Sequence, residues 1–172
     1  MLKLVSPTPA YREQVLDYQR EFREAGEHAF GTSSLDSAQT FEDWYQEVVN
    51  NSRQETVQPG LVPANQYLGV VEETGEVVGM LNLRHYLNDS LLRFGGHIGY
   101  SVRKSQRRKG YAAQMLALSL KEAKKLGLSR VLVTCDRENI GSAKTILHNG
   151  GKLENEVCEP DGTPVQRYWI EL

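Results

Sequence analysis

Residues 97–114 read HIGYSVRKSQRRKGYAAQ and combine two structural patterns that a basic turn joins. In the first part, Ile98, Tyr100 and Val102 alternate with residues that point to the opposite face, which predicts a strand. In the last part an alanine-rich segment begins whose apolar residues recur at helical spacing, which predicts a helix over residues 110–126. A strand, a basic turn and a helix therefore follow one another directly.

The apolar run RVLVTC, residues 130–135, comes after this helix and is typical of a strand buried on both faces. A strand–helix–strand unit of this kind predicts a right-handed crossover between two parallel strands. Other strands are predicted at residues 2–6, 66–73, 77–87, 152–158 and 165–172, and other helices at about 9–25, 38–50 and 139–149. The sequence therefore predicts a mixed α/β class in a single domain over residues 1–172.

Length and composition limit the kinds of protein that this chain can be. Its 172 residues suit one compact domain, and an apolar fraction of 40% argues against disorder. A protein that binds nucleic acid along its surface is normally basic, whereas the net charge here is −2. Cys135 and Cys158 are too few for a disulfide framework or a zinc site, and Cys135 is expected to be buried. No apolar run of about 18 residues suggests a membrane span, so the expected compartment is the cytoplasm.

Positive charge is concentrated directly before Gly110. The five cations are Arg103, Lys104, Arg107, Arg108 and Lys109. Like charges repel, so their crowding needs a reason. An anion would be one, because a helix start offers it a place through its free N–H groups and positive dipole. Gly110 has no Cβ and lets the backbone approach a bulky anion, and the small Ala112 and Ala113 extend that clearance.

The basic run is also compatible with a solvated face, a localisation signal or an RNA-binding patch, and these three alternatives remain open. Its place between a strand and a helix, and the lack of interleaved aromatic residues, argue against the last two. The dinucleotide pattern G-x-G-x-x-G and the phosphate-loop pattern G-x-x-x-x-G-K-[ST] are both absent. The residues by themselves therefore favour a small anionic ligand of another kind.

Residues 107–112, RRKGYA, match R/Q-x-x-G-x-G/A, the signature of the GNAT N-acetyltransferases. As in that family, the motif lies between the fourth strand and the third helix, and Val102 ends the strand before it. Asn139 and Ser142, after the strand RVLVTC, resemble the second marker of the family. The order of strands and helices fits over essentially the whole chain, and RHYLN…GGHIGYSVRKSQRRKGYA is similar to one bacterial branch of uncharacterised members.

This resemblance implies a central mixed, mostly antiparallel sheet with splayed parallel fourth and fifth strands, flanked by about four helices. It implies acetyl-CoA as the donor, no metal, and backbone N–H groups of residues 108–113 around the pyrophosphate. Main-chain groups of Tyr100 and Val102 would pair with the pantetheine and the acetyl carbonyl, and Asn139 would bind the pantetheine arm. The expected donor-binding residues are Tyr100, Val102, Arg107, Arg108, Lys109, Gly110, Tyr111, Ala112, Ala113, Asn139 and Ser142.

The resemblance also implies direct attack of a neutral primary amine on the thioester. Many relatives protonate the leaving thiolate from a tyrosine seven residues after the Asn, but that position is Ile146 here. We therefore assign no general acid, since a thiol pKa near 8.5 lets the thiolate leave unaided.

Many relatives take the amine proton with a carboxylate on the fourth strand, which this chain lacks. His97 is the first candidate base because its reference pKa is near 6.5, and His85 is the second. For either residue the alternative is an exposed histidine without a catalytic role. Three carboxylates remain open as bases acting through water, namely Glu72, Glu73 and Asp89.

The acceptor is expected to be an amine of a small molecule or a peptide. In this family the loop between the first two helices and the final strands shape its pocket, here residues 28–34 with Trp44, Arg84 and Tyr168. His28 and Phe30 line that pocket or form an ordinary cluster under a long loop.

Two alternatives to an enzyme remain open. A non-catalytic acyl-CoA sensor would bind the donor without amine-dependent release of thiol. A nucleic-acid module would show steep dependence on salt. Exposed edge strands near the C-terminus make a homodimer possible.

Overall fold

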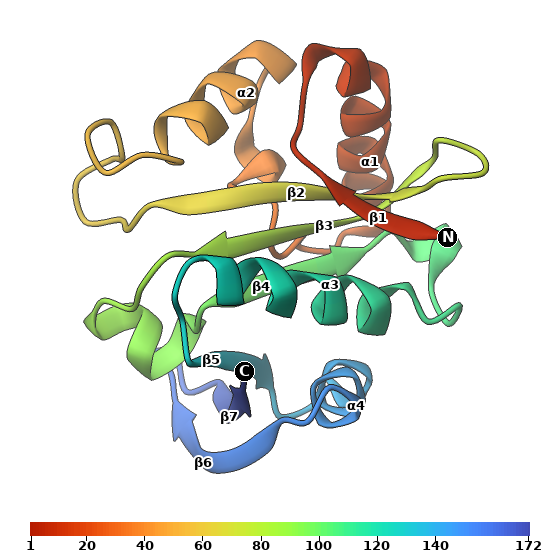
Figure 1. Cartoon of the computed structure of the whole chain (residues 1–172). Helices are drawn as coiled ribbons and strands as arrows, with labels where there is room; N and C mark the ends of the chain where they lie inside the picture. Colours follow the sequence, from red (N-terminus) through yellow and green to blue (C-terminus); the bar gives the residue numbers. More distant parts are fainter.

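A computed structural model describes residues 1–172, and its seven strands form two sheets. The larger sheet has the order β1-β2-β3-β4 and the smaller one β5-β7-β6, and all paired neighbours are antiparallel (Figure 1). The strands are β1 Leu2–Val5, β2 Ala64–Val71, β3 Val77–Arg84, β4 Ile98–Val102, β5 Arg130–Asp136, β6 Lys152–Cys158 and β7 Pro164–Glu171. Every strand that the sequence predicts is present.

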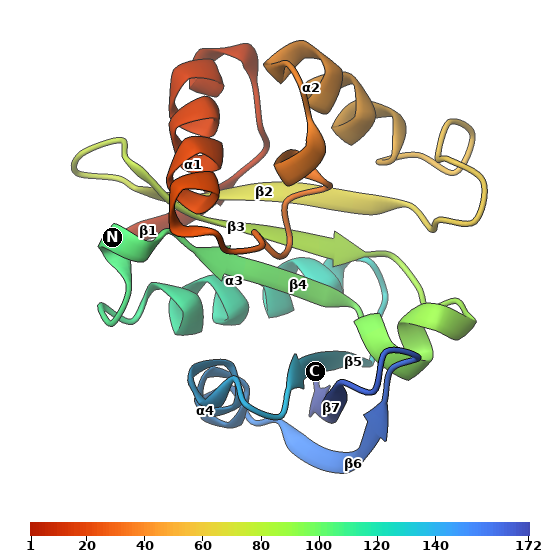
Figure 2. The same cartoon turned by 180° about the vertical axis from the view of Figure 1, so that it is seen from behind.

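Helices cover both faces of the larger sheet. They are α1 Arg12–Ala25, α2 Phe41–Asn50, α3 Tyr111–Lys125 and α4 Ile140–His148. Helices α1 and α2 lie on one face and α3 on the other, while α4 lies beside the smaller sheet (Figures 1 and 2). Helix α2 begins later than predicted because Thr40 caps it, with its Oγ1 accepting a hydrogen bond from the Asp43 N–H at 3.1 Å.

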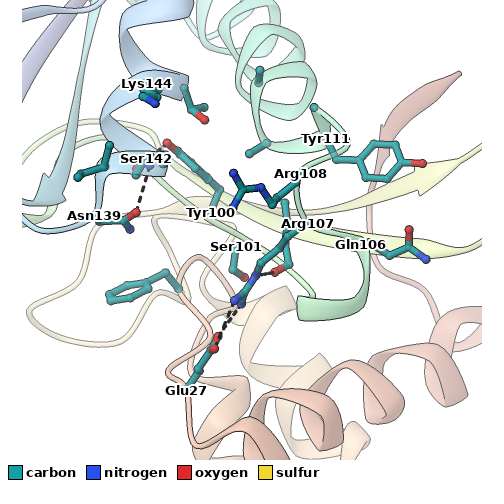
Figure 3. Close-up of a pocket in the computed structure, with 18 of the residues that line it drawn as sticks. Glu27, Tyr100, Ser101, Gln106, Arg107, Arg108, Tyr111, Asn139, Ser142 and Lys144 are labelled. Carbon is teal, nitrogen blue, oxygen red and sulfur yellow. Dashed lines mark hydrogen bonds and ion pairs between the residues drawn. The ribbon is translucent and has the colours of Figure 1, made fainter.

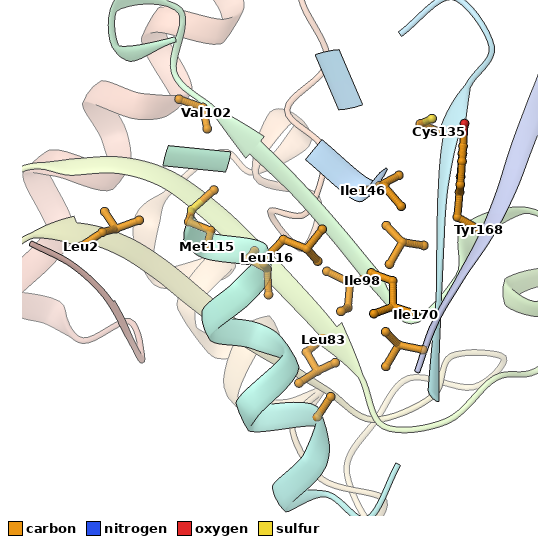
Figure 4. Close-up of a cluster of buried hydrophobic side chains, with 14 of the residues drawn as sticks. Leu2, Leu83, Ile98, Val102, Met115, Leu116, Cys135, Ile146, Tyr168 and Ile170 are labelled. Atoms are coloured by element: carbon orange, nitrogen blue, oxygen red, sulfur yellow. The ribbon is translucent and has the colours of Figure 1, made fainter. Parts of the chain in front are cut away.

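Two hydrophobic cores fill the space on the two faces of the larger sheet. The first lies under α1 and α2 and includes the fully buried Tyr18 and Trp44. The second lies between α3, β4 and the smaller sheet, where Leu116 and Ile146 have no exposed surface (Figure 4). Burial of each such side chain contributes about 1.5 to 3 kcal/mol, so the second core holds the two sheets together.

Strands β4 and β5 run in the same direction but contact each other at one end only (Figures 1 and 2). There the His97 N–H donates to the Leu132 carbonyl at 2.7 Å, and the Leu132 N–H donates to His97 Nδ1 at 2.8 Å. Past that point the strands belong to separate sheets and share no ladder. This divergence is the splay that the family resemblance implies.

The open side of β4 presents main-chain groups to the splay. Arg103 N–H donates to the carbonyl of Val78 on β3 at 3.0 Å. Because successive residues of a strand alternate in direction, the N–H and C=O groups of Tyr100 and Val102 then point away from β3. These are the two residues whose main-chain groups are expected to bind the donor.

Three short helical turns are absent from the sequence prediction, namely Leu35–Ser37, Leu91–Gly95 and Lys104–Gln106. Residues 88–96, predicted as a loop, contain a π-helical turn over Leu91–Gly95 that packs against β5, where Thr134 Oγ1 donates to the Phe94 carbonyl at 2.6 Å. Such short turns carry no periodic signal, so the pattern of the sequence does not reveal them. None of the helices in the structure combines the length and the apolarity needed to cross a bilayer.

Candidate active site

A cavity of about 840 Å³ opens where β4 and β5 diverge. Its wall comes from the end of α1 and the loop after it, from β4, from the turn before α3, and from the first turns of α3 and α4 (Figure 3). Segments more than 100 residues apart in sequence, such as Glu27 and Lys144, therefore face the same space. The cavity is lined by all but one of the residues expected to bind the donor.

Six consecutive backbone N–H groups, those of residues 108–113, have no hydrogen-bond acceptor within the protein. The first helical bond of α3 runs from Gln114 N–H to the Gly110 carbonyl, so the earlier N–H groups stay free. Two left-handed residues, Arg108 at φ 64° and Gly110 at φ 83°, shape the backbone before the helix. Consecutive free N–H groups at the positive end of a helix are suited to binding a phosphate or pyrophosphate.

Only part of the basic run faces this group of N–H donors. The side chains of Arg107 and Arg108 line the cavity, and Lys144 joins them from α4, which the sequence alone did not indicate (Figure 3). The Lys109 side chain lies outside the cavity and donates to Gln106 Oε1 at 2.8 Å. A direct donor contact of the Lys109 side chain is therefore not supported, although its N–H is among the six free groups.

Arg103 has a structural role instead of the expected place around the anion. Its guanidinium is buried against α1, where it bonds Asp17 and Glu21 at 2.6 Å each. Arg107 is partly engaged in the same way: it bonds Glu27 at 2.6 Å and donates from Nε to the Val102 carbonyl at 2.9 Å. Carboxylates of α1 and its following loop thus offset the repulsion within the basic run.

Two hydroxyl groups meet across the splay. Tyr100 of β4 and Ser142 of α4 are hydrogen-bonded at 2.8 Å, and burial raises the pKa of Tyr100 to about 12. Asn139 caps α4, its Oδ1 accepting from the Ser142 N–H at 3.1 Å, which leaves its amide N–H groups for other partners (Figure 3). The cavity therefore offers neutral hydrogen-bonding groups in addition to its cations.

The two histidines predicted as candidate bases do not face the cavity. His97 is only 5% exposed, and its Nδ1 is occupied by the Leu132 N–H, so it joins β4 to β5. His85, with a pKa lowered by burial, bonds Asn65 at 3.0 Å away from the cavity. Their assignment as bases therefore finds no support in the cavity lining, because neither imidazole is among the residues that form it. The three carboxylates considered as bases acting through water also lie outside the cavity, namely Glu72, Glu73 and Asp89.

Replacing His97 with Gln is expected to change how stability depends on pH. Burial, with the nearby Arg84 charge, lowers the pKa of His97 to about 4, below its ordinary value of 6.5. The neutral imidazole therefore adds stability that is complete above pH 6.5 and is lost as the pH falls toward 4. Between pH 7 and 4.5 the wild type should lose about 2 to 3 kcal/mol more unfolding free energy than His97→Gln.

Urea unfolding at several pH values measures this difference. Parallel pH curves for the two proteins would show that His97 does not titrate in this way. At pH 7 the folded His97→Gln protein should keep its turnover, which separates this structural role from that of a base.

The loop between α1 and α2 supplies the wall opposite α3. His28 and Phe30 line the cavity, which agrees with the first of the two interpretations of the sequence. Their rings pack edge to face with centroids 4.4 Å apart. Trp44 and Tyr168 are buried in the cores instead, and Trp44 Nε1 donates to the Thr32 carbonyl at 2.6 Å. Glu27 also lines the cavity, and no pattern in the sequence had indicated it.

A model of the GNAT acetyltransferase domain matches residues 2–152 of this chain. The chain belongs to the GNAT acetyltransferase family. This confirms the resemblance carried by residues 107–112, and it makes the protein an acyltransferase. A comparison with curated proteins gives no match.

Solved structures of other acetyltransferases share the GNAT fold. RimL, a ribosomal L7/L12 α-N-protein acetyltransferase in complex with coenzyme A, has 17% identity and a TM-score of 0.73 over 99% of this chain and 94% of its own. The ribosomal-protein-S5-alanine acetyltransferase of Vibrio fischeri has 16% identity and a TM-score of 0.73 over 99% and 92%. MccE, a microcin C7 self-immunity acetyltransferase in complex with acetyl-CoA and AMP, has 15% identity and a TM-score of 0.71 over 99% and 92%. At these identities the likeness confirms the predicted fold.

This GNAT protein differs from many relatives at Ile146. The side chain is fully buried in the core and does not line the cavity. Cys135 is buried in the same core, as its apolar surroundings predicted, and burial raises its pKa to about 11. Neither position therefore presents an ionised or proton-donating group to the substrates.

Proposed function

We propose that residues 1–172 form one domain that transfers the acetyl group of acetyl-CoA to a primary amine. The observation that carries this proposal is the row of six free N–H groups at residues 108–113, at the start of α3. The cavity also needs both sheets, because β4 belongs to one and the β5–α4 connection to the other. This construction supports the proposal of a single domain.

The fit to acetyl-CoA rests on how charge and backbone groups are distributed along the cavity. The pyrophosphate would bind the free N–H groups, with Arg108 and Lys144 available for the phosphates. The pantetheine arm would lie in the splay, where main-chain groups of Tyr100 and Val102 and the Asn139 amide offer hydrogen bonds. RimL and MccE are described with coenzyme A and acetyl-CoA, which supports the same donor here.

The proposed chemistry is direct attack of the neutral amine nitrogen on the thioester carbon. A C–N bond forms as the carbonyl becomes an oxyanion, which a free N–H group of β4 can stabilise. Collapse of the oxyanion breaks the C–S bond, and the electron pair leaves on the thiolate of coenzyme A. Because the pKa of a thiol is near 8.5, the thiolate can leave without a proton donor.

The names of the relatives and the cavity wall support the proposed class of acceptor. RimL and the Vibrio fischeri enzyme are named for acetylation of ribosomal proteins, at an α-amino group and an alanine respectively. Glu27, His28 and Phe30 give the far wall a carboxylate, an imidazole and an aromatic ring. We propose an amine of a peptide or small molecule that enters along this wall. A cytoplasmic location and a homodimer stay predictions.

The test combines donor binding with turnover. Purified protein and acetyl-CoA are mixed with short peptides that begin with Ser or Ala, with free amino acids and with spermidine. Release of free thiol and a mass increase of one acetyl group on an amine are the expected results. Binding of acetyl-CoA without amine-dependent release of thiol would instead identify an acyl-CoA sensor. If the protein does not bind acetyl-CoA but binds oligonucleotides with an affinity that falls steeply as salt is added, a nucleic-acid module is favoured.

A further inference from the structure

We infer that His28, held in place by Asp36, is the general base of this acetyltransferase. This inference rests on the proposed function and names the group that accepts the proton of the acceptor amine. His28 is the histidine that lines the cavity, whereas His85, His97 and His148 lie outside it. Glu27 lines the same wall, but its carboxylate is paired with Arg107 at 2.6 Å, whereas the His28 imidazole is not paired with a cation.

The imidazole of His28 and the carboxylate of Asp36 lie in direct contact. His28 Nδ1 lies 2.5 Å from Asp36 Oδ2, and the same carboxylate accepts from the Ala29 N–H at 3.0 Å. Because an ionised carboxylate only accepts hydrogen bonds, Nδ1 carries the proton and Nε2 keeps its lone pair. No group of the protein bonds Nε2, and the His28 side chain is 60% exposed, so an incoming amine can reach it.

The loop that carries this pair is fixed against β4 beside Tyr100. Gly31 lies so close to β4 that an added Cβ would be 2.3 Å from the Gly99 carbonyl oxygen and 2.7 Å from Tyr100 Cα. His28 is therefore three residues from the point where the loop touches Tyr100, whose main-chain groups face the splay.

Buried hydrogen bonds hold the loop in this position. Gln66 Nε2 donates to the Gly31 carbonyl at 2.8 Å, and Ser33 Oγ donates to Gln66 Oε1 at 2.7 Å. Asn82 Nδ2 donates to both Ser33 Oγ and Gln66 Oε1 at 3.2 Å. A base works best when its position is fixed before the substrate arrives, and this network supplies that rigidity.

The proton balance of the step is complete with these groups. As the amine nitrogen bonds to the acetyl carbon, its proton passes to His28 Nε2, and the electrons of the C–S bond leave on the thiolate. The proton that His28 accepts lies on the imidazole beside the Asp36 carboxylate and later passes to solvent. Asp36 is thus a positioning residue, and no oxidant, metal or further reactant is needed.

The test compares three variants with the wild type, using the best acceptor among the Ser and Ala peptides, amino acids and spermidine. His28→Ala should lower kcat about 100-fold while the dissociation constant for acetyl-CoA changes less than about twofold. Asp36→Asn keeps an oxygen for the Ala29 N–H and should lower kcat at least about tenfold. His148→Ala removes an exposed histidine outside the cavity and should leave kcat unchanged.

Rescue of activity by added imidazole distinguishes a catalytic role of His28 from a structural one. Because the His28 side chain is mostly exposed, its removal leaves a space that free imidazole can enter, and kcat of His28→Ala should rise with imidazole concentration. An unchanged kcat in His28→Ala overturns the inference, and so does a loss of kcat that accompanies weaker donor binding and resists imidazole. If the wild type binds acetyl-CoA but acetylates none of the amines, the proposed function fails together with this base.

Discussion

Gly110→Trp is expected to raise the dissociation constant for acetyl-CoA more than about 100-fold, a loss of about 2.7 kcal/mol of binding free energy. Gly110 precedes α3 at φ 83°, directly beside the free N–H groups of residues 111–113. The nearest atom to an added Cβ is Gln114 Nε2 at 3.8 Å, so the side chain has room to extend. An indole there would cover the N–H groups that the pyrophosphate needs, and the protein should still fold.

Gly127→Trp is the matched control for this substitution. Gly127 lies just beyond the other end of α3 at φ 86°, and nothing lies within 4 Å of an added Cβ. Both variants should therefore lose about 1 to 2 kcal/mol of stability from the left-handed backbone, but only Gly110→Trp should lose the donor. Isothermal titration with acetyl-CoA measures the difference. Equal affinities in the two variants would remove residues 108–113 from the donor site.

Gly31→Ala is expected to lower the free energy of unfolding by about 3 to 5 kcal/mol, more than most single substitutions do. Gly31 has φ 70°, and its added Cβ would meet backbone atoms of Gly99 and Tyr100 at 2.3 to 2.7 Å. Backbone atoms of a strand cannot move aside as a flexible side chain can. The loop must lift away from β4, which also breaks its bond from Gln66 and displaces the cavity wall.

Gly26→Ala separates the close contact from the backbone conformation. Gly26 ends α1 at φ 67°, nearly the same angle, but nothing lies within 4 Å of an added Cβ. It should lose only about 1 to 2 kcal/mol, the cost of an L residue in the left-handed region. Urea unfolding of both variants gives the two values. A difference of less than about 1 kcal/mol between them would mean that the loop does not press against β4 as the structure shows.

The two glycines illustrate how the two halves of the active site are built. The absence of a side chain at Gly110 lets a ligand reach the backbone, whereas the absence of a side chain at Gly31 lets the loop contact β4. The first requirement is local to the start of α3 and is visible in the sequence around it. The second depends on where β4 passes, and no property of the loop sequence reveals it.

The amino-acid sequence by itself determined the elements and the donor side of the site. Alternation in residues 97–103 and helical spacing after Gly110 predicted β4 and α3, because both patterns follow from hydrogen bonds and side-chain directions within a few residues. The free N–H groups at residues 108–113 are likewise a property of one helix start. The family signature lies in the same short segment, which is why it could be found without a structure.

Only the tertiary structure decided what the charged and titratable side chains do. Arg103 faces two carboxylates of α1, and His97 bonds the backbone of β5, although both flank a strand that the sequence placed correctly. His28 and Asp36 come together at the cavity while the predicted bases do not. The physical reason is that the partner of a side chain can lie anywhere in the sequence, as the 82 positions between Glu21 and Arg103 show, and is fixed only when the core packs.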